Sequence, residues 1–199
     1  MQPKPYILAE THISATILSF TSGPEPQLKL TLTLVGAQQP ITISKEYYQL
    51  FTPSNAFIIS GVPSGRKIYT LFVDINHRLG PPLHLDAEHA DRFLTLEPGI
   101  PCEIHNFSFR PLGSERNSQK AALAPEDDNN KYRGYKFLRL GMNWLEPGDE
   151  YLISARPGLQ IGTWRRGRKE ELMPCAWNTS DGDPLDVVPT EGIRVRIEE

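Results

Sequence analysis

The chain has 199 residues, enough for one large domain or two small ones, and 39% of them are hydrophobic. Its 21 basic and 24 acidic side chains give a net charge of −3, which excludes the strong positive field of a typical nucleic-acid-binding protein. No segment approaches the roughly 20 consecutive apolar residues of a membrane span, and two cysteines are too few for a disulfide framework. We therefore expect a soluble, cytoplasmic protein whose partners include neither nucleic acid nor a membrane.

Alternation of apolar and polar residues dominates the chain and predicts half-buried strands. In residues 28–35, LKLTLTLV, four leucines share one face and Lys29, Thr31 and Thr33 share the other. Residues 12–20 and 40–44 are predicted strands of the same kind. Further strands are predicted at 55–60, 67–75, 92–96, 102–110, 135–140, 150–155 and 192–197, and glycine or proline separates most of them. The spacing favours an all-β fold, an immunoglobulin-like sandwich of two antiparallel sheets.

Three segments interrupt the alternation. Residues 44–51 and 85–93 contain helix formers and predict short helices. Residues 112–131 are mostly polar and predict a long, mobile surface loop inserted between two strands. We expect a single β-sandwich domain over residues 1–199 that carries this loop.

The tetrapeptide Leu-Glu-Pro-Gly occurs at 96–99 and again at 145–148, each time before an apolar strand. Proline followed by glycine at the two central positions predicts a type II-like turn, because the glycine supplies a positive φ. The second copy continues into Tyr151. This arrangement resembles the corner of fibronectin type III and other immunoglobulin-like domains, and the resemblance implies that the Tyr151 hydroxyl bonds back to the backbone.

A second resemblance covers residues 12–160. Residues 28–43, LKLTLTLVGAQQPITI, and 93–99, FLTLEPG, are similar to BsuPI-type intracellular proteinase inhibitors and to fungal deuterolysin-type propeptides. This resemblance implies a β-sandwich fold and gives proteinase inhibition as an alternative function.

Residues 181–187, DGDPLDV, resemble the aspartate motif of soluble inorganic pyrophosphatases, which implies Mg²⁺ ligands at Asp181, Asp183 and Asp186. Such chemistry also needs basic and tyrosine partners around the phosphates, and the twelve residues after Val187 do not supply them. We therefore interpret the segment as a solvated turn, with no catalytic residue and no metal ligand.

Residues His84–Asp91 collect two histidines and three acids, but His84 and His89 are five apart rather than the four that pair two zinc ligands on a helix. We interpret this cluster as an exposed acidic turn. A metal-dependent enzyme that uses this cluster or the three aspartates stays open as an alternative; we expect no cofactor.

Residues 162–172, GTWRRGRKEEL, are the leading candidate for a binding surface. Tryptophan and arginine are enriched at interface hot spots, and arginine binds carboxylates through a planar fork. The candidate binding residues are Trp164, Arg165, Arg166 and Arg168. The alternative is a charged sheet edge that prevents unwanted strand pairing. Our leading hypothesis is a non-catalytic module that binds another protein here; the sequence leaves that partner and the oligomeric state open.

Overall fold

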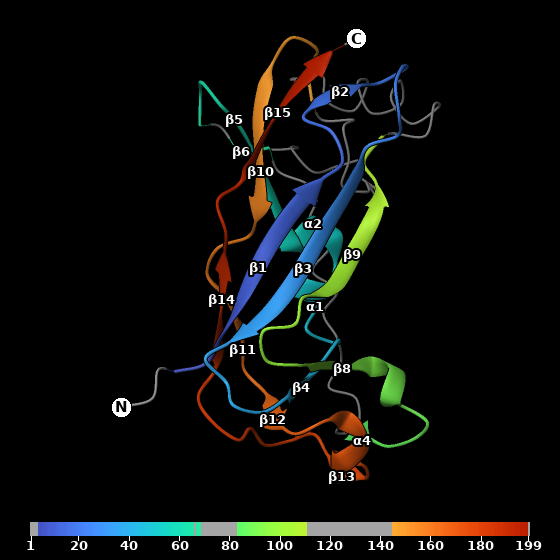
Figure 1. Ribbon diagram of the computed structural model, residues 1–199, viewed down its shortest axis with the longest axis vertical. Helices are drawn as coiled ribbons and strands as arrows, with labels where there is room; N and C mark the ends of the chain where they lie inside the picture. The colour runs from blue at the N-terminus through green and yellow to red at the C-terminus, as the bar shows by residue number, and fades with distance from the viewer. Residues whose placement is uncertain (1–3, 66, 69–82, 111–144, 199) are drawn as a thin grey trace, which may run out of the picture.

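The computed structural model describes residues 4–65, 67–68, 83–110 and 145–198 (Figure 1). The predicted loop at 112–131, the predicted strand at 135–140 and most of the predicted strand at 67–75 lie outside these residues. Within them, strands predominate and helices are short, so the prediction of an all-β fold is confirmed. No described helix has the length and hydropathy needed to cross a membrane.

Two five-stranded sheets make up most of the described structure. Sheet A has the order β11 (Leu159–Ile161), β14 (Leu185–Pro189), β1 (Tyr6–Ile13), β3 (Gln27–Val35), β9 (Cys102–Ser108). It curls into a half-barrel. Sheet B has the order β2 (Ile17–Ser19), β15 (Ile193–Glu198), β10 (Glu150–Ala155), β5 (Phe57–Gly61), β6 (Lys67–Ile68).

The prediction of purely antiparallel sheets is wrong. Strand β1 pairs in parallel with β14, and β15 pairs in parallel with β2, so both sheets are mixed. Antiparallel neighbours can be joined by a short hairpin, whereas parallel neighbours need a long connection. Here β1 and β14 come from opposite ends of the chain, and local alternation carries no information about such a pairing.

The main hydrophobic core is continuous across both sheets. The four leucines of β3, predicted to share one face, are all fully buried: Leu28, Leu30, Leu32 and Leu34. They belong to the same cluster as Ile153 of β10 and Val195 of β15, which come from the inner face of sheet B. Each such side chain contributes about 1.5–3 kcal/mol through removal of its apolar surface from water. Period-two burial therefore accounts for the joining of the two sheets.

Several element boundaries differ from the prediction. The predicted strand at 12–20 is divided: β1 begins earlier, at Tyr6, and β2 covers only Ile17–Ser19. The helix predicted at 44–51 is reduced to α1 (Tyr48–Phe51), and a second short helix, α2 (Pro53–Ala56), precedes β5. Of the helix predicted at 85–93, only a 3-10 turn, η1 (Ala90–Arg92), forms. The last part of DGDPLDV is not a turn but the start of β14.

A third sheet and several short elements cover one end of the molecule, at the bottom of Figure 1. The sheet has the order β12 (Trp164–Arg166), β4 (Ile41–Ser44), β8 (Phe93–Leu96). Beside it lie α4 (Lys169–Leu172) and the two-stranded sheet β13 (Cys175–Ala176) and β7 (His84–Leu85). We call these elements, together with residues 177–184, the end cap. Leu85, Phe93 and Trp177 form a small apolar cluster within the end cap, separate from the main core, to which the buried apolar residues of β4 and β12 belong.

Both Leu-Glu-Pro-Gly segments form the predicted corners. Gly99 and Gly148 have φ values of 71° and 89°, the left-handed region in which glycine is favoured. At the second corner the Tyr151 hydroxyl accepts a hydrogen bond from the backbone N–H of Glu146 at 2.9 Å. Tyr151 is 4% exposed, and burial raises the pKa of its hydroxyl above the ordinary value of 10.0. The backbone contact expected of Tyr151 is therefore present.

Candidate functional site

The predicted binding segment forms an edge strand of the end cap. Strand β12 pairs on one side with β4, in the register Trp164 with Ile43, Arg165 with Thr42 and Arg166 with Ile41. Successive side chains of a strand point to opposite faces, so Trp164 and Arg166 share one face and Arg165 occupies the other. The four predicted residues therefore do not form a single surface.

Trp164 is a core residue. It is 3% exposed and belongs to the main hydrophobic cluster, and its indole Nε1–H donates to the carbonyl oxygen of Asp183 at 2.9 Å. The ring also lies against Gly182, where an added Cβ would be 2.8 Å from Cζ2 of the indole. Trp164 thus holds β12 on the core and leaves little of its surface for a partner.

The aspartate segment, residues 181–187, begins along the edge of β12 that does not pair with β4. The backbone N–H of Asp181 donates to the carbonyl of Trp164 at 3.0 Å, and the Asp181 carboxylate accepts the backbone N–H of Arg166 at 2.8 Å. The Ser180 hydroxyl lies 3.3 Å from both the nitrogen and the oxygen of the Trp164 backbone. Backbone groups of an edge strand need partners, and here a loop supplies them. This is the observed role of the DGD sequence.

The three aspartates do not converge. Asp186 lies on β14 and accepts hydrogen bonds from Gln160 at 2.7 Å and from Lys4 at 3.4 Å, which lower the pKa of its carboxyl group. Asp183 contributes its backbone carbonyl to Trp164 and is exposed. Among the described residues, no three histidine, cysteine, aspartate or glutamate side chains lie together in a way that could hold a metal ion.

The His84–Asp91 cluster is a local turn. Asp86 Oδ1 lies 2.9 Å from both the backbone nitrogen and the ring Nδ1 of His89, and the backbone hydrogen bond is the main reason that the pKa of Asp86 is lowered. His84 lies on β7 and is exposed. His105 is buried on β9, and its Nε2 bonds to the Leu50 carbonyl at 2.8 Å.

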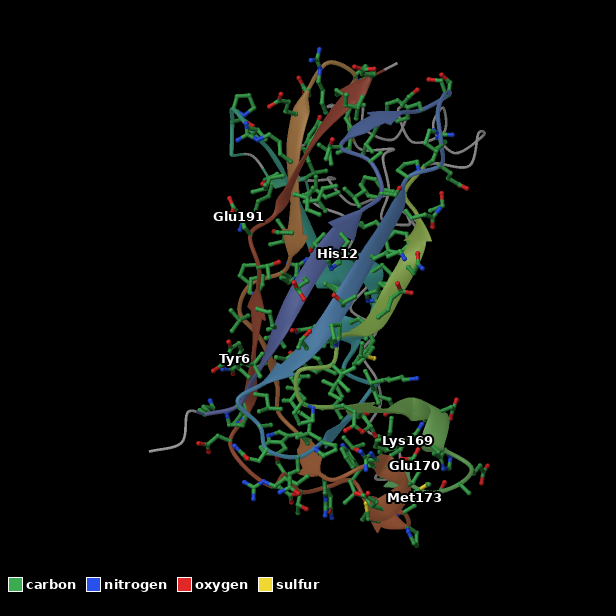
Figure 2. The ribbon with its side chains drawn as sticks, in the orientation of Figure 1. Tyr6, His12, Lys169, Glu170, Met173 and Glu191 are labelled. Carbon is green, nitrogen blue, oxygen red and sulfur yellow. The ribbon has the colours of Figure 1, made fainter. Side chains whose placement is uncertain are left out.

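Arg168 has its partner on this chain. Its Nε and Nη2 donate to the two carboxylate oxygens of Glu97 at 2.7 and 3.2 Å, and hydrogen bonding to Glu97 raises the pKa of Arg168. The Glu171 carboxylate accepts the Arg168 backbone N–H at 3.0 Å at the start of α4. Figure 2 shows the neighbouring Lys169 within the end cap, far from His12 on β1. Lys169 Nζ donates to the carbonyl of Ala90 at 3.2 Å.

Arg165 and Arg166 differ from Arg168 because neither forms an ion pair in the described part of the chain. Arg166 is exposed, and its guanidinium lies 5.8 Å from the ring centroid of Trp164, within the range of a cation–π contact. Arg165 is half-buried, and its Nη2 donates to the carbonyl of Ala176 at 3.1 Å and to Thr179 Oγ1 at 2.6 Å. Both of these acceptors are uncharged.

Comparisons with protein-family models, with curated proteins and with solved structures found no match to this chain. Functional inference therefore depends on the geometry of the end cap. Sequence reasoning missed Glu97 and Thr179, which bind two of the predicted arginines. Glu97 is 71 residues from Arg168, and no local spacing links the two positions.

Proposed function

We propose that this protein is a non-catalytic protein-interaction module that contacts its partner through Arg165 and Arg166 of the end cap. The supporting observation is the contrast among neighbouring cations: the Arg168 guanidinium is paired with Glu97, whereas the guanidinium groups of the two arginines of β12 form no ion pair in the described residues. Arginine is enriched at protein interfaces, where its charge is matched by groups of the partner.

We infer that the two five-stranded sheets form an immunoglobulin-like sandwich. The tyrosine corner at Tyr151 and the single cluster shared by the inner faces of the sheets support this assignment. An experimental structure in which the two sheets close into one barrel would contradict it.

We also infer a cytoplasmic location, in keeping with two free thiols, Cys102 and Cys175, on different strands. Cell fractionation tests it: recovery of the protein in a membrane or secreted fraction would overturn this inference.

The interaction function is tested by affinity capture from a cell extract followed by mass spectrometry. The variant Arg165→Gln/Arg166→Gln removes both charges of β12. The matched control, Arg194→Gln/Arg196→Gln, removes two exposed charges from β15 of sheet B. We expect the wild type and the control to retain the same partner and the β12 variant to lose it, with thermal unfolding confirming that all three proteins are folded. Equal retention by all three proteins would contradict the proposed surface.

A further inference from the structure

Arg165 ends a row of polar side chains on the face of the β12-β4-β8 sheet opposite Trp164. The register places Arg165 beside Thr42, and Thr42 beside Thr95. The two threonines are satisfied within the end cap: Thr42 Oγ1 donates to the Gly167 carbonyl at 2.8 Å, and Thr95 Oγ1 accepts the Lys169 backbone N–H at 3.1 Å. Arg165, on the edge strand, is the member of the row that reaches the exposed segment at Thr179.

The guanidinium of Arg165 is only partly used by the protein. Its Nη2 makes both of the hydrogen bonds described above, to Ala176 and Thr179, whereas its Nε is buried and has no acceptor in the part of the chain that the structure describes. A half-buried charge normally has a counter-charge, because its transfer from water is costly when it is unpaired. The Nη1 group is the remaining donor, and a carboxylate there would form the charge-assisted contact that Arg165 lacks among the described residues.

Thr179 provides a second donor at the same place. Its hydroxyl oxygen accepts from Arg165, so its proton is left to donate to another group. Thr179 is exposed, and nearby Trp177 is 7% exposed with an indole Nε1–H that has no acceptor within the described ranges. Two buried donors without acceptors, Arg165 Nε and Trp177 Nε1, therefore belong to the same small unit.

We propose that the end cap binds a carboxylate side chain of an acidic peptide segment through Arg165 and Thr179. This inference rests on the proposed interaction function and names the chemistry of the partner. A singly charged carboxylate suits one arginine and one hydroxyl, whereas sites for phosphate groups use clusters of arginines. The exposed carboxylates of Asp181 and Asp183, close in sequence to Thr179, repel a doubly charged group more strongly than a singly charged one.

The test is a titration of the full-length, ¹⁵N-labelled protein with a hexaglutamate peptide, followed by NMR through the backbone amides and the Arg165 Nε–H signal. We expect saturable shifts at Arg165 and Thr179 and none with hexaglutamine. Arg165→Lys retains the charge but loses the planar fork, so its affinity should fall about tenfold or more. Thr179→Val should weaken binding by a smaller factor. Arg196→Lys, at an exposed position of β15, is the matched control and should bind as the wild type does.

Three results would overturn the proposal: no shift at millimolar hexaglutamate, equal affinity of Arg165→Lys and the wild type, or inorganic phosphate competing as strongly as the peptide. The last result would show a general anion site. If hexaglutamate fails while partner capture still depends on the two arginines, only the carboxylate assignment is wrong. If partner capture is also insensitive to them, the proposed function is wrong as well. Backbone NMR spectra of each variant show whether it is folded. If Thr179→Val does not fold, the affinity of Arg165→Lys for hexaglutamate alone decides the outcome.

Discussion

The main core and the end cap are built from similar strands but are stabilised differently. The main core is one hydrophobic cluster that joins sheets A and B and includes Ile43 and Trp164 of the end cap, whereas the outer part of the end cap has a separate cluster of three buried residues, Leu85, Phe93 and Trp177. Polar contacts add to this small cluster, among them the Glu97–Arg168 pair and the Asp181 carboxylate on β12. Regions with little buried apolar surface open more readily. We therefore expect the end cap to be the less stable part.

The two tryptophans of the end cap give the strongest test of this comparison. Trp164 belongs to the main cluster and has a satisfied indole nitrogen, so Trp164→Ala should lower the free energy of unfolding by about 3–5 kcal/mol. Trp177 belongs to the small cluster, where its ring centroid lies 4.6 Å from the ring centroid of Phe93. Trp177→Ala should reduce global stability less and mainly increase amide exchange in β7 and β13. Equal losses in urea denaturation would show that the two clusters act as one.

Gly182→Ala tests the contact between the aspartate segment and Trp164. A Cβ at this position would lie 2.8 Å from the buried indole, so the segment or the ring must move. Overpacking of this kind costs about 1–3 kcal/mol, measurable as a lower urea midpoint. Gly162→Ala is the matched control, because no atom lies within 4 Å of its added Cβ. A Gly182→Ala protein as stable as the control would contradict the close packing of this segment.

Tyr151→Phe probes the main core with a change of one oxygen atom. The variant keeps the buried ring but leaves the Glu146 N–H without its acceptor, which should cost about 1–2 kcal/mol in urea denaturation. Tyr6→Phe is the control, on a less buried ring of β1. An unchanged midpoint for Tyr151→Phe would show that the corner is held by its proline and glycine alone.

The sequence predicted the features that depend on neighbouring residues. The alternation in β3 identified the buried leucines, and the Leu-Glu-Pro-Gly turns identified the corner at Tyr151. The sequence did not predict the parallel pairing of β1 with β14, because that contact joins segments from the two ends of the chain. In the candidate site, sequence reasoning selected the arginines but could not separate Arg168 from Arg165. The difference is a glutamate on a distant corner, which only the fold brings within reach.

His105 gives the main core a different acid response from the end cap. Burial lowers the pKa of His105 below its ordinary value of 6.5, and no charged side chain contributes to this shift. As the pH falls, His105 of the unfolded chain therefore takes up its proton at a higher pH than His105 of the folded chain. The free energy of unfolding should fall as the pH drops below about 6.5. The lowered pKa of Asp86 in the end cap acts only at stronger acid, below its ordinary 3.8. His105→Gln retains a donor for Leu50 and should remove the loss at mild acid; unchanged pH dependence of the urea midpoint would contradict this assignment.

The smallest expected effect concerns the ion pair that holds α4 to the corner at Glu97. Both side chains are partly exposed, at 51% for Arg168 and 31% for Glu97, so water and salt weaken their attraction. Arg168→Gln should leave the urea midpoint of the main core nearly unchanged while amide exchange in α4 and β8 increases. A double-mutant cycle with Glu97→Gln should give a small favourable coupling that decreases as salt is added. If exchange increases equally throughout sheets A and B, the end cap is not an independent unit, because loss of its polar contacts then destabilises the whole fold.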